Sequence, residues 1–105
     1  MLVKVGFAVL YRWRLKPGRE KSFVETWAKM TELIKEQCGG LGSRLHQLED
    51  GTWAAYAQWP DRETWAAMQG RDSIDKIASA QMREAIEESF EPVLMVPVKD
   101  LLLFD

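Results

Sequence analysis

The stretch GGLGSRLHQLEDGTWAAYAQWPDRETWAAM, from Gly39 to Met68, decides the fold of this chain. It begins with glycines of the kind that end helices, and it continues with a strand-like run over residues 43–49. Asp50-Gly51 follows, and this dipeptide favours a two-residue type I′ hairpin turn, because both of its central positions need a positive φ. A second strand-like run covers residues 52–59. The stretch therefore predicts a helix end, a β-hairpin and the start of another helix.

A two-residue turn would also fix the register of the two strands. It places His46 opposite Ala55. Opposed residues of an antiparallel pair project from the same face of the sheet. We therefore expect His46 on the face that carries Trp53 and Trp59.

The residues before this stretch predict a strand and a helix. Residues 3–14 alternate between apolar, largely β-branched or aromatic side chains and a mixed set, which is the period of a β-strand. Lys16-Pro17-Gly18 would end this strand. Residues 19–37 repeat apolar side chains at three- and four-residue steps, starting at Phe23 and Trp27, which predicts an amphipathic helix.

The residues after the hairpin predict a second helical region, in two pieces, and a last strand. A short helix runs to about residue 69 with Asp61 as its N-cap, and a longer one covers residues 73–89 with Ser73 as its N-cap. Residues 93–104 are apolar on both faces and predict a strand. Pro97 cannot donate to a sheet ladder, so this strand should lie at an edge or contain a bulge.

The predicted order of elements is β-α-β-β-α-β, in a single domain that spans residues 1–105. With right-handed crossovers, this order gives an α+β, ferredoxin-like fold with a four-stranded antiparallel sheet in the order 4-1-3-2. The chain is 47% hydrophobic and has five tryptophans, and three of its strands look apolar on both faces. Two helices cover only one sheet face. We therefore expect a homodimer, in which a second copy covers the other face.

Charge and composition exclude several classes of partner. The net charge of −2 does not suit a nucleic-acid-binding surface, and no stretch reaches the roughly 20 apolar residues of a membrane-spanning helix. A single cysteine permits no internal disulfide, and the N-terminal residues do not resemble a secretory signal, so we expect a cytoplasmic protein. Ligating side chains are not clustered at metal-binding spacings, so we expect no metal.

Several features in combination point to a known family. They are the turn before the first helix, the glycine helix end, the Asp-Gly hairpin and a tryptophan pair, that is, Lys16-Pro17-Gly18, Gly39-Gly40, Asp50-Gly51, Trp59 and Trp65. Over residues 3–102 the chain thereby resembles the antibiotic biosynthesis monooxygenase family. The resemblance implies a dimeric α+β barrel. The family includes cofactor-independent oxygenases of polycyclic phenols, quinol monooxygenases and haem-degrading enzymes, so the resemblance implies less about chemistry than about fold.

The residues at the functional positions of the haem-degrading branch do not match. Those enzymes use an Asn on the first strand, and a Trp and a His on the helices after the third strand. The corresponding positions here hold Tyr11, Met68 and Ala78, and the sequence has no Asn and no His after His46. The resemblance therefore implies an oxygenase that needs no cofactor. Such an enzyme requires a dry aromatic pocket and groups that accept a proton and stabilise an anion.

His46 and Tyr11 are the candidate catalytic residues. His46 is the only histidine and could act as a general base near neutral pH, although it could also be an ordinary strand residue. Tyr11 occupies the strand position that is functional in the family, and its hydroxyl could bind a phenolic oxygen, although its ring could simply pack. Candidate substrate-binding residues have side chains that could wall an apolar pocket or hold an anionic group, namely Trp27, Trp59, Trp65, Met68, Tyr56 and Arg12.

Three functions remain open at this point. The first is a cofactor-independent monooxygenase that acts on a small aromatic or quinol-like substrate in a hydrophobic pocket. The second is a non-catalytic dimeric barrel, for small-molecule binding or stress response, that holds a small hydrophobic or aromatic molecule without consuming it. The third is a structural dimer with a filled interior. The presence of a cavity between the sheet and the helices separates the third from the other two.

Overall fold

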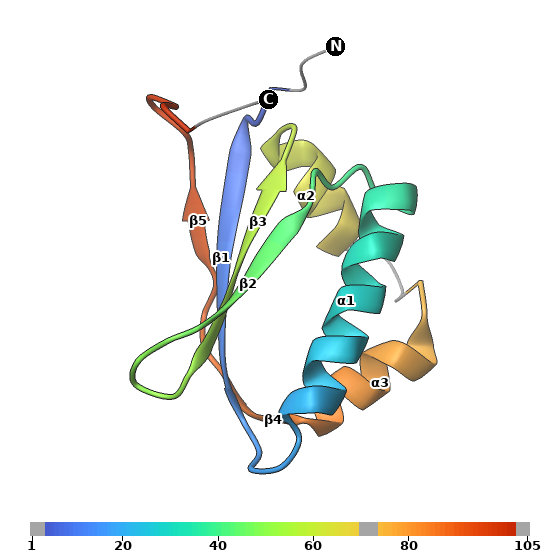
Figure 1. The fold of residues 1–105 in the computed structure, drawn as a ribbon. Coiled ribbons are helices and arrows are strands. Elements are labelled where there is room, and N and C mark those ends of the chain that lie inside the picture. Colours follow the sequence, from blue (N-terminus) through green and yellow to red (C-terminus); the bar gives the residue numbers. More distant parts are fainter. Residues whose placement is uncertain (1–3, 70–73, 103–105) are drawn as a thin grey trace.

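The computed structural model describes residues 4–69 and 74–102 of the chain. Within these residues, five antiparallel strands form a sheet and three helices cover one of its faces (Figure 1). The order of elements along the chain is β1 (Phe7–Leu15), α1 (Glu20–Gln37), β2 (Ser43–Gln47), β3 (Trp53–Trp59), α2 (Arg62–Gln69), α3 (Lys76–Glu84), β4 (Ile86–Ser89) and β5 (Val93–Met95). The strand order β2-β3-β1-β4 confirms the predicted ferredoxin-like sheet.

The helix on either side of the hairpin begins or ends as predicted. After α1, Gly39 adopts a φ of +78°, the left-handed conformation that lets the chain turn away from a helix. At the start of α2, the Asp61 carboxylate accepts a hydrogen bond of 2.7 Å from the backbone amide of Thr64. Asp61 is therefore the N-cap. In the part of the chain that the structure describes, no helix combines the length and the apolar character needed to cross a membrane.

The predicted two-residue turn of the hairpin was wrong. Gln47 lies opposite Trp53, and the amide of Leu48 donates to the carbonyl of Thr52 at 2.8 Å, which leaves a three-residue loop. Only the glycine of Asp50-Gly51 has a positive φ, of +88°. The Asp50 carboxylate instead accepts hydrogen bonds from the amide and the hydroxyl of Thr52, at 2.9 and 2.6 Å. These side-chain bonds stabilise a turn in which Asp50 keeps an ordinary backbone conformation.

This change of turn shifts the register of β2 by one residue. His46 lies opposite Ala54 rather than Ala55. A shift by one residue moves every side chain of a strand to the other face of the sheet. His46 and Arg44 therefore lie on the face away from the helices, here called the open face, and Leu45 packs into the core beneath the helices.

The prediction of a helix over residues 73–89 was also wrong in its second half. α3 ends at Glu84, and β4 pairs with the end of β1 through a bulge between Arg14 and Leu15. The amide of Lys16 donates to the carbonyl of Ala85 at 2.9 Å, which continues this pairing. Hydrogen bonding to the edge of β1 outweighs the modest helix preference of so short a segment.

The predicted N-cap of that helix, Ser73, lies outside the described residues. Asp75 caps α3 instead, because its carboxylate accepts a hydrogen bond of 2.9 Å from the amide of Ala78. The helix therefore begins after residue 75 and is shorter at both ends than the pattern of apolar residues suggested.

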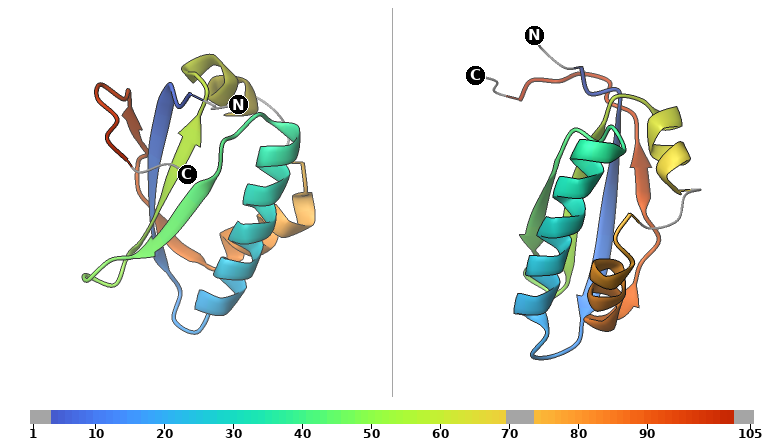
Figure 2. Two further views of the ribbon diagram at one scale, coloured as in Figure 1. Left: turned by 45° about the horizontal axis from the view of Figure 1, so that its top comes forward. Right: turned by 90° about the vertical axis from the view of Figure 1, so that its right-hand side faces the viewer.

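The last strand is divided into two short pieces along the same edge of β1. β4 pairs with Trp13–Leu15 and β5 pairs with Ala8–Leu10. β5 ends before Pro97, as expected for a residue that cannot donate to a ladder. The segment from residue 96 to residue 102 forms no strand. Figure 2 shows it beyond β5, and it lines hollows together with Ala8 and Tyr56 of the open face. Residues 103 and 104, also predicted as strand, lie outside the described residues.

The core beneath the helices consists of two clusters along β1 and β3. The first is centred on Phe23 of α1, whose ring contacts Trp13 at 5.1 Å between centroids. The second is centred on Phe7, Val9 and Trp59 near the other end of the sheet. Tyr11 packs against both clusters. The space between them is incompletely filled, and this space holds the candidate site.

Candidate functional site

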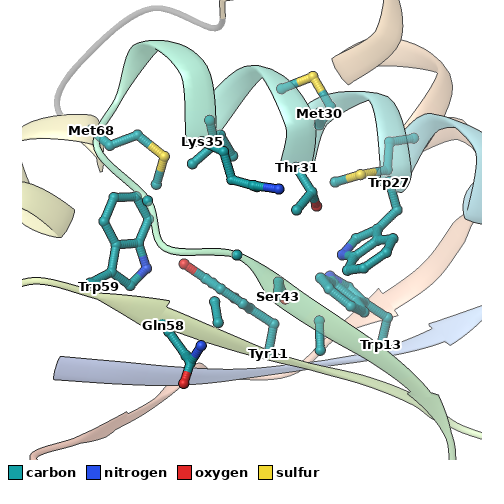
Figure 3. Close-up of a pocket in the computed structure, with 16 residues that line it drawn as sticks. Tyr11, Trp13, Trp27, Met30, Thr31, Lys35, Ser43, Gln58, Trp59 and Met68 are labelled. Carbon is teal, nitrogen blue, oxygen red and sulfur yellow. The ribbon is translucent and has the colours of Figure 1, made fainter. Parts of the chain in front are cut away.

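A cavity of about 160 Å³ lies between α1 and the sheet (Figure 3). β1 and β3 form its floor and α1 forms its roof, while one methionine each from α2 and α3, Met68 and Met82, contributes to its walls. The lining is almost entirely apolar. The structural alternative of a completely filled interior is therefore disfavoured.

The cavity exists because small residues occupy the floor. β3 presents Ala55 and Ala57 toward the helices, and Gly40, Gly42 and Ser43 continue the lining beside them. Alanine side chains are too small to fill the gap between a sheet and a helix that packs on it. The side chains of α1 bridge that distance on either side of the alanines, and the volume above the alanines stays open.

The Tyr11 hydroxyl is the best-positioned polar group in this lining. The indole Nε1 of Trp65 donates to it at 2.9 Å, and the side chain of Gln69 also hydrogen-bonds to it. Burial raises the pKa of Tyr11 above its usual value, while the hydrogen bonds to Trp65 and Gln69 act in the opposite direction. Tyr11 therefore keeps its proton at neutral pH and can act as a hydrogen-bond donor.

Four of the predicted site residues line the cavity together, namely Tyr11, Trp27, Trp59 and Met68. Figure 3 shows Trp27 and Trp59 at opposite ends of the cavity, with Tyr11 between them on the floor. Trp65 supports the wall from behind, because its ring contacts Phe7 at 5.5 Å between centroids and its nitrogen holds the Tyr11 hydroxyl.

The other three predicted residues, His46, Tyr56 and Arg12, are not among the residues that line this cavity. His46 was placed beside Trp53 and Trp59 by the wrong register, and it instead accepts a hydrogen bond of 3.0 Å from Arg44. Tyr56 and Arg12 belong to the same open face, because they alternate with the residues that face the helices.

Arg12 has structural partners on the open face. Its guanidinium lies 3.7 Å from the Asp50 carboxylate and 4.9 Å from the centre of the Phe90 ring. Within the described residues, its Nε atom is buried without a hydrogen-bond partner. These contacts tie the hairpin to the edge of the sheet, and they place the Arg12 charge on the opposite side of the sheet from the cavity.

Thr31 and Lys35, which were not predicted from the sequence, also line the cavity. Both lie on α1, and Figure 3 shows the Lys35 ammonium directed over the cavity. The Lys35 ammonium also lies 3.7 Å from the Glu32 carboxylate. Residues four apart share one face of a helix, so the row Trp27, Thr31, Lys35 was visible in the sequence. It was overlooked because the row becomes polar toward its end.

Metal-ligating side chains do not gather near this site. Within residues 4–69 and 74–102, no three His, Cys, Asp or Glu side chains form a group that could hold a metal ion.

Comparison with known proteins identifies the family. A sequence profile described as antibiotic biosynthesis monooxygenase matches residues 6–88. The chain belongs to the antibiotic biosynthesis monooxygenase family. The match includes the hairpin and β4, which are the segments where the predicted details were wrong. No protein with a curated description matches the chain in sequence.

Solved structures of similar fold include members of the same family. SnoaB, a cofactor-independent oxygenase from Streptomyces nogalater, is 16% identical, with a TM-score of 0.75 over 93% of this chain and 98% of its own. A candidate antibiotic biosynthesis monooxygenase from Chloroflexus aurantiacus J-10-fl is 19% identical, with a TM-score of 0.71 over 90% of this chain and 94% of its own. At these identities, the likeness establishes the fold alone.

Proposed function

We propose that this protein is a cofactor-independent monooxygenase that acts on a small aromatic, quinol-like substrate bound in the cavity above Tyr11. The observation that carries the proposal is the pairing of an apolar cavity with one buried hydroxyl that Trp65 holds in place. Membership of the antibiotic biosynthesis monooxygenase family and the fold shared with SnoaB support it.

The size of the cavity favours a single aromatic ring. Its volume is about 160 Å³. A cavity of roughly 150 Å³ lined by apolar side chains is known to bind benzene. A hydroquinone fits this volume with small side-chain adjustments, whereas a polycyclic substrate exceeds it and would extend out of the cavity.

The proposed reaction uses the substrate's own electrons. A hydroquinone and dioxygen give a hydroxyquinone and water: one oxygen atom forms a new bond to a ring carbon, and the other leaves as water with two protons. The substrate loses four electrons and dioxygen gains four, so no external reductant is required. The protein's tasks are to exclude water, orient the ring and stabilise the phenolate that reacts.

Tyr11 and Lys35 would stabilise that phenolate. They are the only titratable side chains among the described residues that line the cavity, and a phenol hydroxyl and an ammonium group are both hydrogen-bond donors. Donors directed at a developing negative charge in an apolar site lower the barrier to its formation. We therefore assign stabilisation of the substrate anion to Tyr11, with Lys35 at the cavity edge. The geometry of the cavity lends no support to His46 as its base.

The same lack of a base among the described lining residues favours a second candidate function. A barrel that binds a small aromatic molecule without reaction needs the apolar cavity and the Tyr11 donor, but no group that removes a proton. This candidate predicts that a phenol raises the melting temperature of the protein and is recovered unchanged.

An oxygen-electrode assay separates the two functions. Chelator-treated protein would be incubated with substituted hydroquinones and, for comparison, with three-ring anthrones. The proposal predicts oxygen uptake above the spontaneous rate with hydroquinones, little with anthrones, and an oxygen atom from labelled dioxygen in the product. Binding without oxygen uptake across the hydroquinones would reject the oxygenase and leave the binding protein.

We also propose that the protein is a homodimer. Apolar side chains are exposed along the segment from β5 to the end of the described residues, with Val98 at 97% and Leu101 at 80% exposure. Exposed apolar segments of this kind mark protein–protein contacts. The open face itself carries Arg12, Arg44 and His46, so it is less apolar than the sequence suggested. The segment from β5 to residue 102 accounts for much of the exposed apolar surface.

Light scattering on a gel-filtration column tests this second proposal. We expect wild-type protein to elute with twice the mass of the chain, and a Val98→Asp/Leu101→Asp variant to elute as a monomer. Ile77→Asp is the matched control, because Ile77 is 74% exposed on α3, on the side of the helices. A monomeric wild type at micromolar concentration would contradict the homodimer.

A further inference from the structure

We propose that the indole N–H of Trp59 is a ligand-binding donor, and that it selects one-ring aromatic ligands that carry an oxygen acceptor. This inference rests on the proposed use of the cavity as a ligand site. Trp59 lines the cavity and is only 2% exposed. Among the described residues, its Nε1 atom is buried without a hydrogen-bond partner.

An unpartnered indole nitrogen is unusual in a folded core. Buried Trp N–H groups normally find an acceptor, because a donor that is removed from water without a partner destabilises the folded protein. The rest of the Trp59 ring is well packed against Phe7, Val9 and Ala57. The ring is therefore held by apolar contacts, and its polar edge meets the cavity.

The loop between α1 and β2 restricts the Trp59 ring further. A side chain at Gly40 would reach within 3.6 Å of the Trp59 ring, and within 2.9 Å of Ile34, so the backbone passes close to both. The ring has little freedom to rotate its nitrogen toward a protein acceptor. A ligand in the cavity is the remaining source of an acceptor near the described residues.

The orientation of the nitrogen matches that of the other donor in the cavity. Figure 3 shows the Trp59 nitrogen and the Tyr11 hydroxyl on the sides of their rings that face the same space. One ligand oxygen with two lone pairs could accept from both. A phenolate, phenol or quinone oxygen has this capacity, whereas a hydrocarbon does not.

The Trp59 nitrogen is screened from solvent. A ligand oxygen that displaces the side chains around the nitrogen gains a hydrogen bond, but a hydrocarbon of equal size gains nothing. This screening therefore sharpens the preference for oxygen-bearing ligands.

Titration of ¹⁵N-indole-labelled protein with p-cresol and p-xylene tests the inference. These ligands have the same shape and differ only in a hydroxyl against a methyl group. We expect p-cresol, but not p-xylene, to shift the Trp59 indole proton resonance downfield more than those of the other four tryptophans. The Trp59→Phe spectrum, which lacks one resonance, would assign the peak.

Affinities supply a second readout. Wild-type protein should prefer p-cresol over p-xylene, and Trp59→Phe should reduce this preference about 3- to 10-fold, the effect of one net hydrogen bond. The matched control is Trp53→Phe, which removes the indole of a tryptophan that does not line the cavity and should keep the preference. The preference is the ratio of the p-cresol and p-xylene affinities in one protein. Because the two ligands have the same shape, the effect of a change in cavity volume cancels in this ratio.

The outcomes separate this inference from the oxygenase proposal. If p-cresol shifts the Trp59 resonance while hydroquinones are not oxidised, the inference holds and the oxygenase fails. Equal indole shifts with both ligands, an unchanged preference in Trp59→Phe, or no binding of p-cresol at millimolar concentration would overturn the inference, whatever the oxygen electrode shows. Should Trp59→Phe not fold, phenylalanine variants of the other four tryptophans assign the Trp59 resonance by elimination, and the pair of titrations on the wild-type protein then decides.

Discussion

Replacing Tyr11 with phenylalanine lowers the turnover of a hydroquinone about 100-fold, if the hydroxyl stabilises the reacting phenolate. Removal of one preorganised donor to a developing oxyanion costs about 10²–10³ in kcat. The phenylalanine ring would keep the packing that Tyr11 makes against both core clusters. The affinity for a hydrocarbon such as p-xylene should therefore stay unchanged while the rate of oxygen uptake falls.

Tyr56→Phe is the matched control for this variant. It removes the same hydroxyl from the neighbouring strand, but Tyr56 belongs to the open face and does not line the cavity above Tyr11. We expect its kcat to stay within about twofold of wild type, as for a surface change. His46→Ala should behave in the same way. A rate unchanged in Tyr11→Phe, or lost equally in Tyr56→Phe, would contradict the role of Tyr11.

Filling the cavity is the second change with a large expected effect. Ala57→Leu adds three carbon groups above the floor of the site, where Ala57 now lies beside Trp59. Burial of each carbon group contributes roughly 0.8 kcal/mol to the binding free energy. Loss of the space for three such groups should therefore weaken the binding of p-cresol about 50-fold. Because the leucine occupies existing space, the melting temperature should be unchanged or higher. Calorimetric titration and a thermal melt measure the two effects.

Ala28→Leu controls for the substitution itself. Ala28 is exposed on α1 and does not line the cavity, so this variant should bind p-cresol like the wild type. If Ala57→Leu also bound p-cresol normally and remained folded, the ligand would lie elsewhere and the proposed site would be wrong.

The sequence predicted the sheet order because the alternation in β1 and the helical period of α1 are strong, local signals. It failed at residues 85–89, where pairing with β1 outweighed a local helix preference. It failed at the hairpin for a local reason: Asp50-Gly51 has the composition of a type I′ turn, but the bonds from Thr52 to the Asp50 carboxylate favour a longer loop. The Asp-Gly pair and the bonds to Thr52 are both local signals, and the sequence alone did not show which of them prevails.

The error at the hairpin explains why His46 was assigned to the site. The predicted register of β2, which was wrong by one residue, placed His46 on the face with Trp53 and Trp59. In the structure, His46 lies on the open face. Tyr11, Trp27 and Trp59 were correctly grouped, because their positions depend on β1, α1 and β3 rather than on β2. Lys35 could have been found from its spacing to Trp27, whereas the unpartnered nitrogen of Trp59 is visible only in three dimensions.

Diffraction from crystals soaked without oxygen in 4-bromophenol tests most directly whether the cavity is the ligand site. We expect one strong anomalous bromine peak between α1 and the sheet, within contact of Trp27 or Trp59, and the phenol oxygen within hydrogen-bonding distance of Tyr11. A bromine peak on the open face, or a cavity that collapses around its own side chains while bromophenol binds elsewhere, would contradict it.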